Sequence, residues 1–265
     1  MESQFASDAA VLAPLSGNAY VSAAHLSGSP SLLAPPRNVD AQVDLQPRSR
    51  DERLNRLVNV VLAGAALAVL SPLLVLVALA VRFTSPGPVF YRQSRIGIDR
   101  RRSRPGSSDP MYDRRACDLG GRAFSILKFR SMTVDAEGRG GAVWAQKHDP
   151  RVTPVGGALR KTRLDELPQL LNVIRGEMNI VGPRPERPSI FARLRGDIRE
   201  YALRQRAKPG ITGLAQINHS YDASVDDVRV KVRYDLEYLR RQSLVEDLRI
   251  MLLTVPVIVF RRGGW

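Results

Sequence analysis

The sequence predicts an α/β protein, mostly helical with a small sheet, that a hydrophobic helix attaches to a membrane. The first observation is an uninterrupted run of 25 uncharged residues, 57–81. The second is the helical spacing of apolar residues in several segments after residue 158. The third is that strand-like segments are few and short, at residues 89–91 and 124–129.

Residues 1–52 precede the hydrophobic helix and are expected to form a disordered tail. They are rich in Ala, Ser and Pro, show no sustained periodicity, and carry six acidic against three basic side chains. A short segment that binds a partner is the alternative. The chain does not begin with a basic stretch followed by an apolar run, so we expect no cleavable signal peptide.

Residues 53–84 are predicted to form a re-entrant membrane hairpin. As a straight helix the uncharged run would be about 37 Å long, enough to cross a bilayer. Ser71-Pro72 lies inside it, and proline removes a backbone donor and clashes with the preceding turn. Arginines flank both ends of the run, and basic flanks favour the cytoplasmic side. A helix that enters, breaks at Ser71-Pro72 and returns satisfies both conditions. The alternative is a spanning helix that tolerates its proline.

Residues 85–265 are predicted to form one further domain, which begins with a turn cluster of Ser, Pro and Gly. The strand-like segments fall in its first half, separated by a basic, aperiodic loop over 99–121. A second loop is expected over 135–157.

Helices are predicted in the second half of this domain, at residues 158–175, 188–206 and 226–241. Gly176 supplies a stop for the first of them. The mixture of arginines and apolar residues in 188–206 fits a helix at the membrane interface or an ordinary surface helix equally well. The apolar stretch 250–260 is too short to span a bilayer, so it should pack on the body or lie at the interface.

The charge of the chain favours polyanionic partners. Its formal net charge is +14, and residues 53–265 carry 37 basic against 20 acidic side chains. Such a body suits nucleic acid, anionic lipid headgroups or phosphorylated substrates, and a solvated basic face is the plain alternative. A single cysteine, Cys117, excludes an intramolecular disulfide and a multi-cysteine zinc site. The three histidines show no metal-ligand spacing.

Two adjacent carboxylates, Asp165 and Glu166, open the segment 165–175 of the first predicted helix. A helix N-terminus attracts phosphate, but carboxylates there repel it unless a cation intervenes. The pair therefore fits a Mg²⁺-dependent phosphoryl-transfer site, in which few carboxylates and the substrate phosphates share the metal. A carboxylate can also act as a nucleophile. The alternative is structural, with Asp165 as the N-cap and Glu166 as a favourable first-turn charge.

Basic side chains surround this acidic pair in the sequence and are predicted to bind phosphate. Arg184 stands between two prolines, which fix the backbone around a guanidinium that can grip phosphate with two hydrogen bonds. A second rigid loop, 208–213, contains two glycines that would let the backbone approach a ligand. The predicted phosphate-binding residues are Lys128, Arg130, Arg160 and Arg184.

Four stretches of the sequence closely resemble the bacterial sugar transferase family, the monotopic phosphoglycosyl transferases. They are PGPVFYRQSRIG (86–97), FSILKFRSM (124–132), HDPRVTPVGGALRKTRLDELPQLLNVIRGEMNIVGPRPERP (148–188) and KPGITGLAQIN (208–218). Together with the Ser-Pro hydrophobic segment, the resemblance covers about residues 53–265. It implies a compact α/β catalytic domain on the cytoplasmic face of the bacterial inner membrane, with a re-entrant anchor and interfacial amphipathic helices.

The resemblance also implies a reaction. Asp165 would attack the β-phosphate of a UDP-sugar, UMP would leave, and undecaprenyl phosphate would take the sugar phosphate from the enzyme to give undecaprenyl-diphosphate-sugar. Glu166 would assist Mg²⁺ binding and proton handling. Lys128, Arg160 and Arg184 would stabilise phosphate charge, and Gln216 would lie near the donor. This would be the initiating step of exopolysaccharide or other surface glycan synthesis, with a hexose as the expected sugar.

Several points stay open at this stage. The chain reads Asn218-His219-Ser220 where many family members have a Gly-Arg pair, so the contacts to the sugar are uncertain, and a structural role for His219 is the plainer option. A homodimer is compatible with the sequence. The competing hypothesis is a membrane-tethered polyanion- or lipid-binding protein without catalysis. No recognisable nucleic-acid module is present, so we expect no nucleic acid partner.

Overall fold

The computed structural model describes residues 45, 47–99, 120–134, 136, 149–219 and 224–259. Most of the predicted loop 99–121, of the predicted tail 1–52 and of the predicted loop 135–157 therefore lies outside the described residues. The helices are α2 (Glu52–Thr84), α3 (Pro154–Thr162), α4 (Gln169–Arg175), α5 (Pro188–Asp197), α6 (Leu214–Asn218), α7 (Val225–Arg241) and α8 (Leu244–Val259). The strands are β1 (Phe90–Ile96), β2 (Ala123–Phe129), β3 (Asn179–Val181) and β4 (Gly210–Thr212), with 3₁₀ turns η2 (Leu164–Glu166) and η3 (Tyr201–Arg206).

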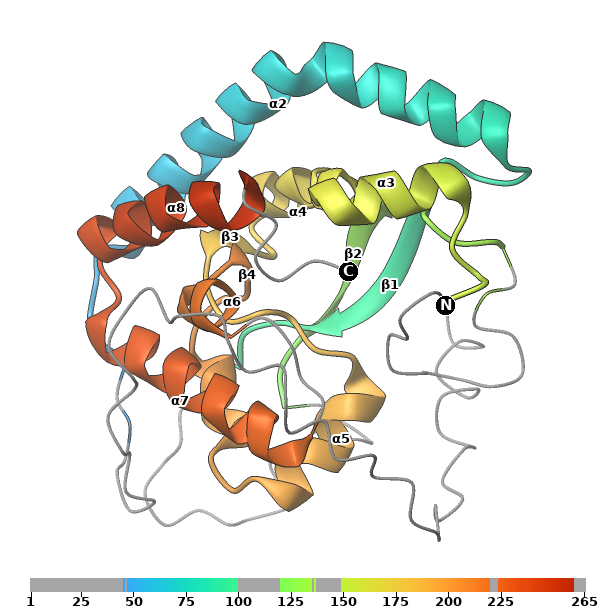
Figure 1. Cartoon of the computed structure of the whole chain (residues 1–265). Helices are drawn as coiled ribbons and strands as arrows, with labels where there is room; N and C mark the ends of the chain where they lie inside the picture. The colour runs from blue at the N-terminus through green and yellow to red at the C-terminus, as the bar shows by residue number, and fades with distance from the viewer. Residues whose placement is uncertain are drawn as a thin grey trace, which may run out of the picture.

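Helix α2 forms an arch over the rest of the protein (Figure 1). It begins at the Asp51 cap, whose carboxylate accepts hydrogen bonds from the backbone N–H groups of Arg53 and Leu54. Pro72 lies inside the helix and leaves the carbonyl of Ala68 without its backbone donor. The Ser71 hydroxyl donates to that carbonyl at 2.8 Å. The predicted break is therefore a bend within one continuous helix.

The described part of the chain contains one helix long and apolar enough to cross a membrane, and this is α2. Its most apolar window has a mean hydropathy of 2.7 and is only 11% buried within the protein, which is unlike the core helix of a soluble protein. Exposed apolar side chains of α2 include Leu57, Val61, Val69, Val75, Leu76 and Phe83. Lipid is the environment that suits such a surface.

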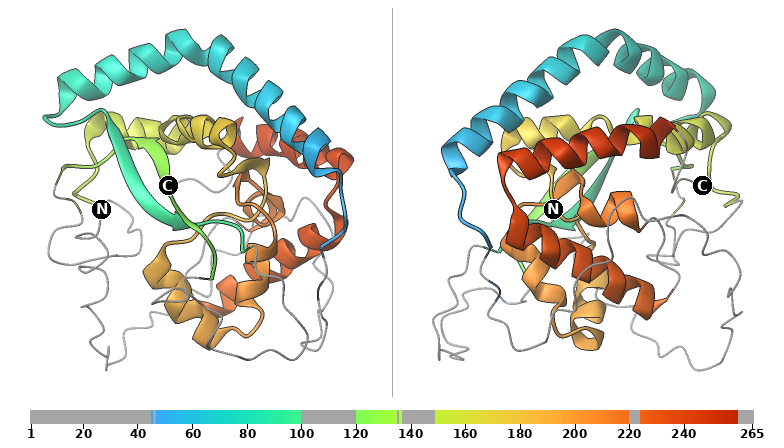
Figure 2. Two further views of the ribbon diagram at one scale, coloured as in Figure 1. Left: turned by 180° about the vertical axis from the view of Figure 1, so that it is seen from behind. Right: turned by 60° about the vertical axis from the view of Figure 1, so that its left-hand side comes forward.

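Both arms of the arch are fixed to the same body. In the N-terminal arm, Arg56 donates to the carbonyls of Val173 and Ile174 at the end of α4. The buried Asn59 accepts a hydrogen bond of 2.7 Å from the Ile180 backbone N–H in β3. At the other end, the Arg130 guanidinium donates to the carbonyl of Ser85, just past the last turn of α2, at 2.7 Å. Figure 2 shows the two arms descending to the same side of the body.

The strands form two separate two-stranded sheets in place of the single small sheet that we predicted. β1 and β2 pair antiparallel, with Phe90 opposite Phe129 and Ile96 opposite Ala123. β3 and β4 pair parallel, with Val181 opposite Thr212. β1 extends beyond the predicted segment 89–91. The prediction was too short because the second half of the strand is polar and carries no apolar strand signal.

The predicted helix 158–175 is interrupted, which corrects the sequence interpretation. α3 ends at Thr162, and its C-cap Arg163 has a left-handed backbone with φ of 59°. The 3₁₀ turn η2 follows, and α4 begins only after Pro168, the ring of which cannot share one helix with the carbonyl of Leu164. Gly176 ends α4 in the left-handed conformation, as predicted.

The remaining helices build the largest core. α7 agrees with the predicted helix 226–241. The segment 188–206 is not one helix but α5 followed by η3, and these lie at the end of the molecule opposite α2 (Figure 1). Phe191 and Tyr201 are both buried in that core, so the apolar residues of this segment pack inside the protein.

α8 lies in one row with α4 and α3 directly beneath the arch (Figures 1 and 2). Its Ile250 is buried, whereas Val245, Leu248, Leu252 and Val255 are exposed and give its outer side an apolar surface. The predicted stretch 250–260 thus falls in the second half of α8, which packs on the body. The end of the predicted tail contacts α7, since the Arg48 N–H donates to the carbonyl of Leu239.

The contact between Asn59 and β3 yields a stability prediction. Asn59→Ala leaves the Ile180 N–H without its acceptor, and an unsatisfied buried donor costs about 1–3 kcal/mol. We expect a lower melting temperature for the variant purified in detergent. Val61→Ala, on the exposed side of the same helix, is the matched control and should melt like the wild type. An unchanged melting temperature for Asn59→Ala would show that this contact does not hold the arm to the body.

Candidate active site

The acidic pair lies in η2, between α3 and α4, and both carboxylates are buried, with 6% exposure for Asp165 and 7% for Glu166. The left-handed turn at Arg163 redirects the chain so that the pair faces inward. Neither residue caps a helix through its side chain, because α4 begins at Gln169 after Pro168. The structural alternative considered from the sequence, an N-cap at Asp165, is therefore excluded.

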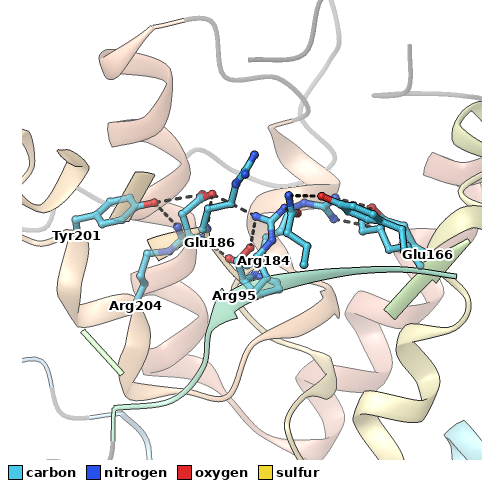
Figure 3. A network of polar contacts seen from close by, with 11 residues as sticks. Arg95, Glu166, Arg184, Glu186, Tyr201 and Arg204 are labelled. Atoms are coloured by element: carbon cyan, nitrogen blue, oxygen red, sulfur yellow. Dashed lines mark hydrogen bonds and ion pairs between the residues drawn. The ribbon is translucent and has the colours of Figure 1, made fainter. Parts of the chain in front are cut away.

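Glu166 forms ion pairs with two cations at once (Figure 3). Lys128 of β2 lies 2.8 Å from its Oε1, and Arg184 donates to both carboxylate oxygens, at 2.6 and 3.2 Å. Burial would raise the pKa of Glu166, but the charges of Arg184 and Lys128 outweigh it and hold the pKa well below the usual value. Glu166 is therefore a permanently charged anchor for both cations.

Asp165 differs from its neighbour, because none of the described residues donates a hydrogen bond to its carboxylate. Burial raises the pKa of Asp165, the charge of Lys128 opposes that rise, and the negative charge of Glu166 adds to it. Its oxygens are thus free to contact a ligand.

Arg184 is positioned by two loops that lie against each other. The Gly182 N–H donates to the carbonyl of Thr212, and the Gly210 N–H donates to the carbonyl of Pro183, both at 2.9 Å. A Cβ atom on Gly182 would stand 2.3 Å from the carbonyl oxygen of Lys208, so glycine is required for this approach. The two rigid loops predicted from the sequence are one structural unit.

A buried polar network behind Arg184 was not predicted. The fully buried Arg204 donates to the backbone carbonyl of Arg184 at 3.1 Å and to the hydroxyl of Tyr201 at 2.9 Å. It also forms an ion pair of 2.7 Å with Asp235 of α7. Nothing local in the sequence marks these residues, since their partners are distant along the chain.

The network continues through Glu186 to Arg95 (Figure 3). The Tyr201 hydroxyl donates to Glu186 at 3.3 Å, and Arg95 of β1 lies 3.4 Å from the same carboxyl group. Burial would raise the pKa of Glu186, but Lys231, Arg95 and Arg204 together lower it below its usual value.

A cavity of about 860 Å³ opens onto the acidic pair. Its polar wall carries carboxylates and a surplus of cations, whereas apolar side chains from β1 and α8 line other parts of it. The charged lining residues are Arg92, Arg95, Lys128, Arg130, Arg160, Arg163, Asp165, Glu166, Arg184, Glu186, Arg187 and Lys231. A cavity of this size and charge suits a phosphorylated small molecule.

The remaining predicted site residues also line the cavity, but in different ways. Arg160 lies in the last turn of α3. Gln216 of α6 donates from its amide to the carbonyl of Ile211 at 2.8 Å. Arg130 is engaged through one nitrogen, which donates to the carbonyl and hydroxyl of Ser85 at the end of α2, whereas its Nε and Nη1 have no partner among the described residues. Its observed hydrogen bonds are those of a helix-end contact.

The fit of a divalent cation depends on the same two carboxylates. Within the described ranges, no group of three or more His, Cys, Asp or Glu side chains could hold a metal ion. Mg²⁺, however, is commonly held by one or two carboxylates together with substrate phosphates. The unpartnered carboxylate of Asp165, next to Glu166, fits that mode of binding.

A buried carboxylate pair among arginines and lysine, below a helix suited to lipid, is the arrangement typical of a membrane-associated protein that handles phosphorylated substrates. The model of the bacterial sugar transferase family matches residues 50–261, and the chain belongs to this family.

Individual relatives agree with this assignment. The chain is 42% identical over 204 residues to the UDP-glucose:undecaprenyl-phosphate glucose-1-phosphate transferase of Escherichia coli, covering 76% of this chain and 39% of that protein. It is 37% identical over 211 residues to the UDP-N-acetylgalactosamine-undecaprenyl-phosphate N-acetylgalactosaminephosphotransferase of Aeromonas hydrophila, covering 80% of this chain and 45% of that protein. It is 37% identical over 221 residues to the exopolysaccharide production protein ExoY of Rhizobium meliloti, covering 78% of this chain and 86% of that protein. The chain thus spans less than half the length of the first two relatives.

The lowered pKa of Glu186 generates a pH prediction. The unfolded chain takes up a proton at the ordinary pKa of 4.5, whereas folded Glu186 resists protonation to a lower pH. The stabilising contribution of its charge is therefore complete above that ordinary value and lost as pH falls through the lowered one. We expect the melting temperature of the wild type to fall more steeply below pH 4.5 than that of Glu186→Gln.

Melting curves at a series of pH values measure this difference. Glu52→Gln, at a side chain that is 69% exposed, is the matched control and should follow the wild type. Parallel curves for the wild type and Glu186→Gln would contradict the prediction.

Proposed function

We propose that this protein transfers a sugar 1-phosphate from a UDP-sugar to undecaprenyl phosphate, which yields undecaprenyl-diphosphate-sugar and UMP. The observation that carries the proposal is the unpartnered carboxylate of Asp165, buried beside a Glu166 that two cations already hold. Family membership and the names of the relatives support the two substrate classes.

The contacts of the two carboxylates suggest different roles for them. Asp165 is the proposed nucleophile, because its lone pairs are not engaged by any donor in the described part of the chain. A carboxylate oxygen of Asp165 forms a bond to the β-phosphorus of the donor. The bond from that phosphorus to the bridging oxygen breaks, and UMP leaves with the oxygen and its electron pair. An oxygen of undecaprenyl phosphate then attacks the same phosphorus and displaces Asp165.

The cations supply the electrostatic part of this mechanism. The diphosphate donor and the monophosphate acceptor carry several negative charges into the cavity, and charge moves onto the leaving oxygen as the bond breaks. Lys128 and Arg184 are held in place by Glu166 before any ligand arrives, so little reorganisation is needed. Arg160 and Arg163 line the same cavity and add positive charge.

Mg²⁺ is part of the proposal. Asp165 and Glu166 would hold it together with phosphate oxygens of the donor, and when bound it would neutralise phosphate charge. Glu166 would contribute to the ion in addition to its contacts with the two cations.

We also propose that α2 is a re-entrant anchor in the bacterial inner membrane, with the body on the cytoplasmic face. Both arms of α2 are fixed to one body, Asn59 and Arg56 at one end and Ser85 at the other. A straight spanning helix would place its two ends on opposite sides of the bilayer, so the attachment of both ends to one body supports the re-entrant arrangement. The relative from Rhizobium meliloti is named for exopolysaccharide production, and we propose that this chain initiates a surface glycan of that kind, with a hexose as the first sugar.

The reaction predicts the consequence of removing the nucleophile. Asp165→Asn is expected to lower UMP release by about a thousandfold or more, since the covalent step is lost. The assay combines UDP-sugars, undecaprenyl phosphate and Mg²⁺, and omission of either the lipid or the metal should abolish turnover. Asp197→Asn, at the exposed end of α5, is the control and should remain active.

Two outcomes would refute the proposal. Full turnover by Asp165→Asn would exclude the covalent mechanism. If the wild type released no UMP from any UDP-sugar yet bound anionic vesicles equally well with and without the Asp165 change, the protein would be a lipid-binding protein.

The anchor predicts the side of the membrane on which the N-terminus lies. An epitope tag placed at residue 5 should be protected from protease added to intact spheroplasts and become cleavable after lysis. A second tag after residue 265 serves as the reference for the same face. Cleavage of the first tag alone in intact spheroplasts would establish a spanning helix.

A further inference from the structure

Five buried polar atoms on residues that line the cavity have no hydrogen-bond partner among the described residues; three belong to Arg95 and Arg130, and the other two lie at the C-terminal end of α6. These two are Oε1 of Gln216 and Nε2 of His219. Both residues line the cavity that contains the acidic pair. A buried polar atom without a partner is costly, so its presence at a ligand cavity points to a partner supplied by the ligand.

The local structure fixes both side chains at one end of α6. The amide nitrogen of Gln216 is engaged by the carbonyl of Ile211, which leaves Oε1 as the free acceptor. His219 follows α6 directly, and its backbone N–H donates to the carbonyl of Ala215 at 2.8 Å. His219 is the C-cap of α6 with an extended backbone, and its side chain lines the same cavity as that of Gln216, so both side chains can contact one ligand.

The chemistry of these atoms selects a neutral polar group. The amide oxygen only accepts, and a neutral imidazole nitrogen either donates or accepts. Neither atom carries a negative or permanent positive charge, and the amide oxygen would repel a phosphate oxygen. A hydroxyl group, which donates once and accepts twice, satisfies both atoms together.

The position of Gln216 indicates which part of the donor it meets. A Cβ atom built on Gly213 would stand 2.3 Å from the carbonyl oxygen of Gly182 and 3.0 Å from Oε1 of Gln216. The amide oxygen therefore lies against the loop that carries Arg184, two residues further along. In a nucleotide-sugar, the group next to the β-phosphate is the sugar, whereas the uracil lies beyond a second phosphate and a ribose.

We propose that His219, together with Gln216, forms a subsite that reads a hydroxyl group of the donor sugar, and that His219 is a specificity-determining residue. This inference rests on the proposed function, since it assumes a UDP-sugar whose β-phosphate lies near Asp165 and Arg184. The sequence alone favoured a structural role for His219, whereas this inference assigns it a contact with the donor sugar.

The test is a double comparison of enzyme and substrate variants. kcat/KM is measured for UMP release from the preferred UDP-sugar and from its analogues that lack one sugar hydroxyl each. His219→Ala should lower kcat/KM for the complete sugar by about 5- to 30-fold, the effect of one lost hydrogen bond. For one deoxy analogue, His219→Ala should cause no further loss, because the missing hydroxyl is its partner. His219→Gln, which keeps a polar nitrogen, should retain most of the activity.

Asn218→Ala is the matched control. Asn218 is the last residue of the same helix, its amide donates to the carbonyl of Leu214, and it does not line the cavity. The Asn218→Ala variant should lower kcat/KM by the same factor for every analogue, or should not lower it at all. Retained melting temperature of His219→Ala confirms that the loss is not one of folding.

The outcomes separate this inference from the proposed function. If the wild type turns over UDP-sugars but His219→Ala loses the same factor with every deoxy analogue, the subsite is refuted and the proposed function stands. The subsite is also refuted if the loss in kcat/KM caused by His219→Ala depends on a change to the uracil ring of the donor and on no sugar hydroxyl. If the wild type turns over no UDP-sugar at all, the proposed function itself fails.

Discussion

The shared ion pairs of Glu166 with Lys128 and Arg184 are the interaction on which the site depends. They join β2, the turn η2 and the loop after β3 directly through side chains. Without the carboxylate, two cations would face each other in a partly buried site, which is costly. With it, the cations are fixed and Asp165 is left with free oxygens.

The same framework ties the site to the membrane helix. In β2, Lys128 contacts Glu166, while Arg130, two residues further, binds the end of α2. α4, which follows the acidic pair, receives Arg56 from the other arm of the arch. Lys128 lies in β2 and Arg130 directly follows the strand, so one short segment of the chain makes both contacts. The site is thereby linked through side chains to both arms of the arch.

Local patterns predicted several elements well and failed where a local signal was missing or misleading. The helical spacing of 226–241, the apolar alternation of 124–129 and the stop at Gly176 all agree with the structure. The helix 158–175 did not survive as one element, since Pro168 and the left-handed Arg163 interrupt it. The segment 188–206 has the composition of an interfacial helix but lies at the far end from α2.

The sequence by itself determined the membrane helix and the residue types of the site, because hydropathy and backbone preferences act within a few neighbouring positions. Only the tertiary structure decided which charges meet. Lys128 and Arg184 are 38 and 18 positions from Glu166, and Arg204 of the second network pairs with Asp235 on another helix. Ion pairing depends on distance in space, which packing of the whole chain sets, so the separate roles of Glu166, Arg130 and the network behind Arg184 emerged only in the folded protein.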